Sequence, residues 1–190
     1  MKNKWTVLLL AVLFLGLLAG AYVLYGNLSE SSTPQTLATQ PSTQSQPQRA
    51  IVPDFTVYDK DGNPVTLHDF LGKPIVLNFW ASWCGPCKSE MPAFQEQYES
   101  LGDDVHFIMV NMTDGSRETV QTATTFLNAQ GYTFPVYFDS DRAAAITYGA
   151  YSLPTTYFID ENGYCITYAM GALSADQLRQ GIDFIYKEES

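Results

Sequence analysis

Trp83-Cys84-Gly85-Pro86-Cys87 is the stretch on which the interpretation of this 190-residue sequence depends. It follows the apolar run 74–80 (PIVLNFW), which predicts a buried strand, and it leads into 88–98 (KSEMPAFQEQY), which predicts a helix. Cys84 is therefore expected at a helix N-terminus, where free backbone N–H groups and the helix dipole stabilise a thiolate. A thiolate there can attack the disulfide of another protein, and Cys87 can then resolve the mixed disulfide.

The same spacing of two cysteines also occurs in zinc ribbons, haem attachment sites and structural disulfides. A permanent disulfide is disfavoured because closing so short a loop stabilises a fold less than closing a longer one. Zinc would need two more ligands, and the candidates His68, His106 and Cys165 do not form a paired motif. We therefore expect no metal and no other cofactor.

Two segments carry a resemblance to a known family. Residues 78–92 (NFWASWCGPCKSEMP) resemble the active-site segment of the thioredoxin superfamily, and more narrowly that of the membrane-anchored TlpA/ResA-like reductases of bacteria. Residues 153–160 (LPTTYFID) resemble the cis-proline loop and the strand that follows it in that family. The resemblance extends from Ile51 to the C-terminus. It implies an α/β thioredoxin fold, which is a mixed central sheet flanked by helices, with an N-terminal β-hairpin and a central insertion.

The resemblance also implies roles for individual residues. Cys84 is expected to be the attacking nucleophile and Cys87 the resolving thiol. Glu90 stands where this family places a glutamate that transfers protons or controls the cysteine pKa. Asn78 stands where ordinary thioredoxins carry a buried aspartate. The alternative for Glu90 is an ordinary solvated glutamate on the helix surface.

Contacts with substrate are expected from Trp83, Gly85, Pro86, Leu153 and Pro154. By resemblance, the peptide bond before Pro154 is cis, and it turns the backbone of Leu153 toward an extended substrate segment. A merely structural turn is the alternative. Of the two tryptophans near the site, we expect Trp83 to be the more exposed.

Further elements follow from the pattern of apolar residues and turn signals. Hairpins are predicted over 55–58 with 65–67 and over 155–160 with 164–170, a strand over 105–111 and an extended piece over 134–138. Helices are predicted over 116–130 with Ser116 as N-cap, over 140–148, and from the N-cap Ser174 onward. Cys165 falls on the last strand, where we expect a buried packing residue rather than a regulatory or intermolecular thiol.

The N-terminal residues predict a membrane anchor. After the basic stub 1–4, residues 5–25 form an uncharged, mostly apolar run that is long enough to cross a bilayer as a helix. Lys2 and Lys4 precede it and no Lys or Arg follows until Arg49, so the N-terminus is expected in the cytoplasm. A cleaved signal peptide is the alternative. Residues 26–50, rich in Ser, Thr, Gln and Pro, predict a disordered linker to a single domain over 51–190.

The charge distribution bears on partners. The net charge is −10, and from residue 51 onward 7 Lys and Arg against 19 Asp and Glu give −12. So acidic a domain argues against nucleic acid as a partner, because phosphates require basic surfaces. Acidic surfaces also keep a domain soluble, and we expect a monomer.

Together these features predict an extracytoplasmic thiol–disulfide oxidoreductase tethered to the cell membrane. Strongly oxidising DsbA-type enzymes carry a histidine between their cysteines, and Gly85-Pro86 in its place favours the reducing direction. The resemblance implies a membrane electron donor of the CcdA/DsbD type. It implies disulfide-containing exported proteins as substrates, in cytochrome c maturation or cell-surface protein repair. A disulfide-forming oxidase and a non-catalytic peptide-binding module or chaperone stay open as alternatives.

Overall fold

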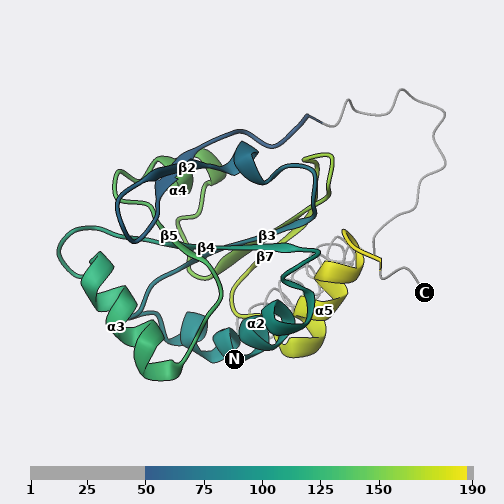
Figure 1. Cartoon of the computed structure of the whole chain (residues 1–190). Coiled ribbons are helices and arrows are strands. Elements are labelled where there is room, and N and C mark those ends of the chain that lie inside the picture. Colours follow the sequence, from purple (N-terminus) through teal and green to yellow (C-terminus); the bar gives the residue numbers. More distant parts are fainter. Residues whose placement is uncertain (1–49, 188–190) are drawn as a thin grey trace, which may run out of the picture. The chain divides into compact units, whose positions relative to one another are not determined.

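The computed structural model describes residues 50–187 (Figure 1). The predicted stub, membrane helix and linker, apart from its last residue, lie outside the described residues. Within 50–187, no helix is long and apolar enough to cross a membrane.

Within residues 50–187, seven strands form one mixed sheet in the order β2-β1-β5-β4-β3-β6-β7. The pairs β3–β4 and β4–β5 are parallel, and all the other pairs in the sheet are antiparallel. The strands are β1 Thr56–Tyr58, β2 Pro64–Thr66, β3 Ile75–Trp80, β4 His106–Asn111, β5 Val136–Phe138, β6 Thr155–Ile159 and β7 Cys165–Met170. The predicted mixed sheet and both predicted hairpins are confirmed.

Helices cover both faces of this sheet. α2 Gly85–Leu101, α3 Val120–Gln130 and α5 Ala175–Asp183 lie on one face, and α4 Ala143–Tyr148 lies on the other (Figure 1). The short 3-10 helix η1 Leu67–Phe70 contributes Leu67 to the same core cluster as α4. The predicted α/β architecture is therefore confirmed, and Ser174 caps α5 as expected, accepting a hydrogen bond from the Gln177 N–H.

The central strand explains why the run 74–80 is apolar without alternation. All six residues of β3 are buried, because helices cover both of its faces. Val76 and Trp80 pack into the core shared with α2, α3 and α5, while Leu77 and Phe79 pack into the core on the α4 side. The strand is thus held from both sides at the point where the active-site segment begins.

The start of α3 differs from the prediction. The helix begins at Val120 with Thr119 as its N-cap, and Ser116 does not cap it. The Asp114 carboxylate instead accepts hydrogen bonds from the N–H groups of Ser116 and Glu118, which folds 114–118 into a turn. This turn places Glu118 against Ser82, a contact between distant segments that the sequence pattern could not show.

The expectation for Cys165 is wrong. This residue is exposed, because β7 is the edge strand of the sheet and its outer side is only partly covered. The thiol donates to the Thr167 carbonyl at 3.6 Å, and partial burial raises the pKa of the Cys165 thiol. A raised pKa makes the thiol less reactive than a free cysteine.

Candidate active site

The redox pair lies where the central strand gives way to a helix. β3 ends at Trp80, α2 begins at Gly85, and Cys84 is the N-cap residue of α2. Cys84 and Cys87 form a disulfide with an S–S distance of 2.04 Å, and the Cys87 N–H donates to Cys84 Sγ at 3.2 Å. An N–H group of the first helical turn therefore faces the outer sulfur, where it can stabilise a thiolate.

The two sulfurs differ in access. Cys84 is 4% exposed and lines a pocket, whereas Cys87 is fully buried beneath it. Cys84 is thus the outer member of the pair, although in this oxidised state it is itself almost fully buried. Gly85 and Pro86 are exposed beside it, and Pro86 occupies the first turn of α2, where its missing N–H is not needed.

Glu90 lies one helical turn after Cys87 and is only 2% exposed, so it is not a solvated surface glutamate. Its two carboxylate oxygens accept hydrogen bonds from Asn78 Nδ2 and from the Leu173 N–H, both at 2.8 Å. Burial raises the pKa of Glu90 from 4.5 to about 7, although the two hydrogen bonds oppose that shift. The carboxyl group can therefore exchange a proton near neutral pH.

Asn78 completes the environment of Glu90. Its side-chain amide also donates to Thr156 Oγ1 at 2.9 Å, while its Oδ1 atom is buried without a hydrogen-bond partner. Rotating the amide by half a turn would place Oδ1 where Nδ2 now lies. In that orientation the amide could accept a hydrogen bond from protonated Glu90, so this site accommodates both charge states of the carboxyl group.

The predicted cis peptide bond is confirmed between Leu153 and Pro154. Pro154 itself is buried and does not line the pocket, so the structure does not place it against a substrate. Leu153 does line the pocket, and its backbone N–H and C=O make no hydrogen bond within residues 50–187. The cis bond thus coincides with a free stretch of backbone beside Cys84.

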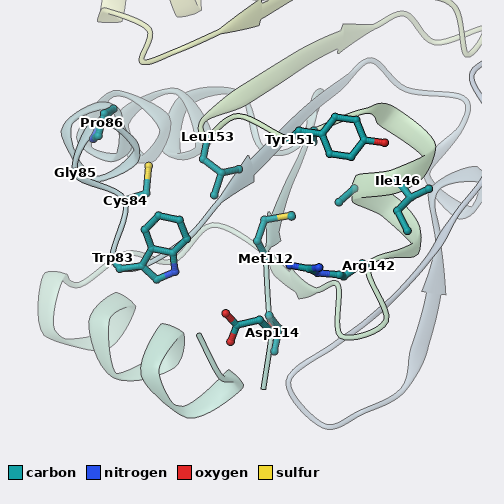
Figure 2. Close-up of a pocket in the computed structure, with 13 residues that line it drawn as sticks. Trp83, Cys84, Gly85, Pro86, Met112, Asp114, Arg142, Ile146, Tyr151 and Leu153 are labelled. Carbon is teal, nitrogen blue, oxygen red and sulfur yellow. The ribbon is translucent and has the colours of Figure 1, made fainter. Parts of the chain in front are cut away.

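The pocket beside the disulfide has a volume of about 500 Å³ (Figure 2). Three segments line it: 83–86 from the active site, 112–114 after β4, and residues between 142 and 153 from α4 and the loop after it. The structure therefore brings together five residues expected at the site: Trp83, Cys84, Gly85, Pro86 and Leu153. Cys87, Glu90 and Pro154 lie behind this surface.

Trp83 forms the exposed wall of the pocket. It is 42% exposed, whereas Trp80 is fully buried, which confirms the expected difference between them. The Arg117 guanidinium lies 3.9 Å from the centre of a Trp83 ring, a distance typical of cation–π contacts. Arg117 therefore holds the ring from the side of the 114–118 turn.

Glu118 is a residue that the sequence analysis missed. It is fully buried, and its carboxylate accepts hydrogen bonds from the Ser82 N–H at 2.8 Å, from Ser82 Oγ at 2.7 Å and from Asn111 Nδ2 at 2.7 Å. No cation among residues 50–187 pairs with it. Because Ser82 directly precedes Trp83, Glu118 and Arg117 together fasten the 114–118 turn to the active-site segment. No local sequence pattern marks this role, because Ser82 and Asn111 are distant from Glu118 or lie on a separate element.

No group of three or more His, Cys, Asp or Glu side chains within residues 50–187 is arranged to hold a metal ion.

The sheet carries a cysteine pair at the junction of its central strand and a helix, and a cis-proline precedes the neighbouring strand β6. These features together define a thiol–disulfide oxidoreductase with the thioredoxin fold. Residues 49–167 match the AhpC/TSA family, and the chain belongs to that family. It is 32% identical to the thiol-disulfide oxidoreductase ResA of Geobacillus thermodenitrificans (strain NG80-2) over 187 residues, which cover 97% of this chain and 99% of ResA.

Two further similarities agree with this assignment. The chain is 29% identical to the thioredoxin-like protein YneN of Bacillus subtilis (strain 168), with 96% of this chain and 99% of YneN covered. The crystal structure of StoA from Bacillus subtilis matches with a TM-score of 0.59 at 30% identity, covering 70% of this chain and 98% of StoA. The resemblance to ResA-like oxidoreductases noted in the sequence is confirmed.

Glu90→Gln tests the buried carboxyl group. Because burial raises the pKa of Glu90 from 4.5 to about 7, the folded protein holds this proton more tightly than the unfolded chain does. Glu90 therefore lowers the free energy of unfolding as the pH rises from 4.5 to about 7, and it has no further effect above that range. In urea titrations of the oxidised protein, the stability of Glu90→Gln relative to wild type should rise across this range. Glu96→Gln, on the exposed side of the same helix, is the control, and a pH-independent difference for Glu90→Gln would contradict the raised pKa.

Glu118→Gln tests the contact between the 114–118 turn and the active site. The glutamine oxygen can still accept from the Ser82 N–H and Asn111 Nδ2, but its N–H₂ group would replace the oxygen that accepts from Ser82 Oγ, and the negative charge that strengthens all three hydrogen bonds would be lost. The free energy of unfolding should fall by about 1–3 kcal/mol, measured by urea denaturation. Alkylation of Cys84 in the reduced protein should change in rate as well, since Ser82 positions that segment. If Glu118→Gln proves as stable and as reactive as Glu96→Gln, the buried carboxylate has no positioning role.

Proposed function

We propose that this protein is a membrane-tethered, extracytoplasmic thiol–disulfide oxidoreductase that reduces disulfides of exported proteins. The observation that carries the proposal is the unequal placement of the two sulfurs. Cys84 opens onto a pocket at the N-terminus of α2, and Cys87 is sealed behind it. An outer nucleophile and an inner resolving thiol are what dithiol–disulfide exchange requires.

The exchange has two steps. In the reduced enzyme, the Cys84 thiolate attacks one sulfur of a substrate disulfide, so that a Cys84–substrate disulfide forms and the other substrate sulfur leaves as a thiolate. The Cys87 thiolate then attacks Cys84 Sγ, which closes the disulfide seen in this structure and releases the second substrate sulfur. The substrate gains two electrons, the enzyme loses two, and an electron donor must return them.

Glu90 is proposed as the group that controls the proton of Cys87. Cys87 has to lose its proton before it can attack, and a buried base matched to neutral pH serves that purpose. The position of Glu90 one turn after Cys87, its burial, and its pKa of about 7 support this role. Asn78, which cannot accept a proton, would then orient Glu90 rather than replace it.

The compartment and the partners are part of the proposal. The apolar run 5–25, with Lys2 and Lys4 before it, supports a membrane helix with the domain outside the cytoplasm. Disulfides persist there, so a reductase needs electrons carried across the membrane. A CcdA/DsbD-type donor, and substrates that are apocytochrome c before haem attachment or oxidised surface proteins, fit that requirement.

The reducing direction is tested by the midpoint potential of the Cys84–Cys87 pair. Titration against dithiothreitol or glutathione should give a value nearer to that of thioredoxin, about −270 mV, than to that of DsbA, about −120 mV. Pro86→His, which inserts the histidine of the oxidising enzymes, should raise the potential. A wild-type value near −120 mV would favour the disulfide-forming oxidase.

Catalytic turnover is tested by trapping. Cys87→Ala removes the resolving thiol, so the variant should accumulate mixed disulfides between Cys84 and its substrates in cells. These should disappear on reduction, and they should be missing from the double variant Cys84→Ala/Cys87→Ala. Partners that are captured equally well by the double variant would indicate a binding module or chaperone without exchange.

A further inference from the structure

The pocket beside Cys84 has apolar walls and one cation directed into it. Trp83, Met112, Ile146 and Leu153 provide the apolar surface, and Figure 2 shows the Arg142 side chain extending between them toward Met112. Ile146 is 64% exposed, so a large part of this apolar surface faces solvent beside the redox pair. Apolar exposure of this kind marks a surface that is covered when a partner binds.

Arg142 is held in an unusual backbone conformation. Its φ of 64° lies in the left-handed region, and it is the only residue other than glycine with positive φ within 50–187. A glycine would adopt this conformation without steric cost. The arginine side chain does not offset this steric cost by capping α4. The Asp139 carboxylate accepts hydrogen bonds from the N–H groups of Ala144 and Ala145 instead.

The guanidinium of Arg142 makes no hydrogen bond or ion pair with residues 50–187. The acids beside it, Asp141 in the chain and Asp114 in the pocket, do not pair with it, and one carboxylate oxygen of each accepts from backbone N–H groups. Asp141 accepts from the Ala143 N–H at 3.1 Å, and Asp114 accepts from the N–H groups of Ser116 and Glu118. By contrast, Arg179 pairs with Asp176 at 2.6 Å on α5. Arg142 thus brings an unused positive charge to a pocket on an otherwise acidic domain.

We propose that Arg142 selects substrates: the pocket takes an extended polypeptide segment that carries an acidic side chain close to the cysteine attacked by Cys84, and that acid pairs with the Arg142 guanidinium. The inference rests on the proposed reductase function and adds a substrate class to it. The free backbone N–H and C=O of Leu153 would align the segment, and the apolar walls would cover its neighbouring side chains. A planar guanidinium suits a carboxylate because it can donate two parallel hydrogen bonds.

The test uses the full-length reduced protein and peptides that differ at one position. Each peptide contains the same disulfide, and Glu, Gln or Lys is placed in turn at every position on either side of the attacked cysteine. For at least one position, kcat/KM should be about five- to tenfold higher with Glu than with Gln, and lower with Lys. Added salt should weaken the preference, because the pair lies at the surface.

Three variants separate charge recognition from damage to the fold. Arg142→Gly suits the left-handed backbone, so it should fold at least as well as wild type and lose the preference for Glu. Arg142→Glu should reverse the preference toward Lys. Arg179→Gln, a surface arginine of α5 outside the pocket, should keep it.

Two results would overturn the proposal. One is equal reduction of the Glu, Gln and Lys peptides at every position by the wild type, which would leave the reductase function intact. The other is a Glu preference that persists in Arg142→Gly. If the wild type reduces none of the peptides although dithiothreitol does, the proposed function fails, and the selectivity proposal fails with it.

Discussion

The structure depends on one junction, at which a strand buried on both faces ends and a helix begins after four residues. β3 lies in the middle of the sheet, and its pairing with β4 and β6 determines that the strand ends at Trp80. α2 must start at Gly85, and its first N–H groups have no partner within the helix. The Cys87 N–H meets the sulfur of Cys84 instead. The N–H groups at the start of α2, which have no acceptor within the helix, therefore make a thiolate favourable at this position.

Three buried carboxylates organise the segments around this junction. Glu90 accepts from the Leu173 N–H, Glu118 from the Ser82 N–H, and Asp139 from two N–H groups of α4. None of them pairs with a cation among residues 50–187, so each is stabilised by hydrogen bonds to neutral donors. Burying such groups is unfavourable unless every donor is in place. These hydrogen bonds fasten the loops that carry the redox pair and the pocket to the rest of the domain.

Burial raises the pKa of both Glu90 and Asp139, and Glu90 reaches about 7. Of the three, Glu90 lies on the helix of the cysteines, one turn after Cys87. The exposed side of the site is cationic and aromatic: the Arg117 guanidinium lies over the Trp83 ring, and Arg142 is directed into the pocket. A buried carboxyl group thus lies behind a pocket surface that carries Trp83 and Arg142.

The cis bond before Pro154 was predicted from the resemblance of residues 153–160 to a known family. Local patterns in the sequence were enough for the buried strand 74–80, the helix after the cysteines and both hairpins, because each is set by neighbouring residues. They failed where a distant partner decided the outcome. α3 starts at Val120 because Glu118 is drawn to Ser82, and Cys165 is exposed because β7 has no neighbour on one side. The chain alone therefore determined the redox pair and the fold that presents it. Only the tertiary structure decided that Glu90 is buried and that Arg142 reaches the pocket, since both depend on segments that are far apart in sequence and meet only when the sheet has formed.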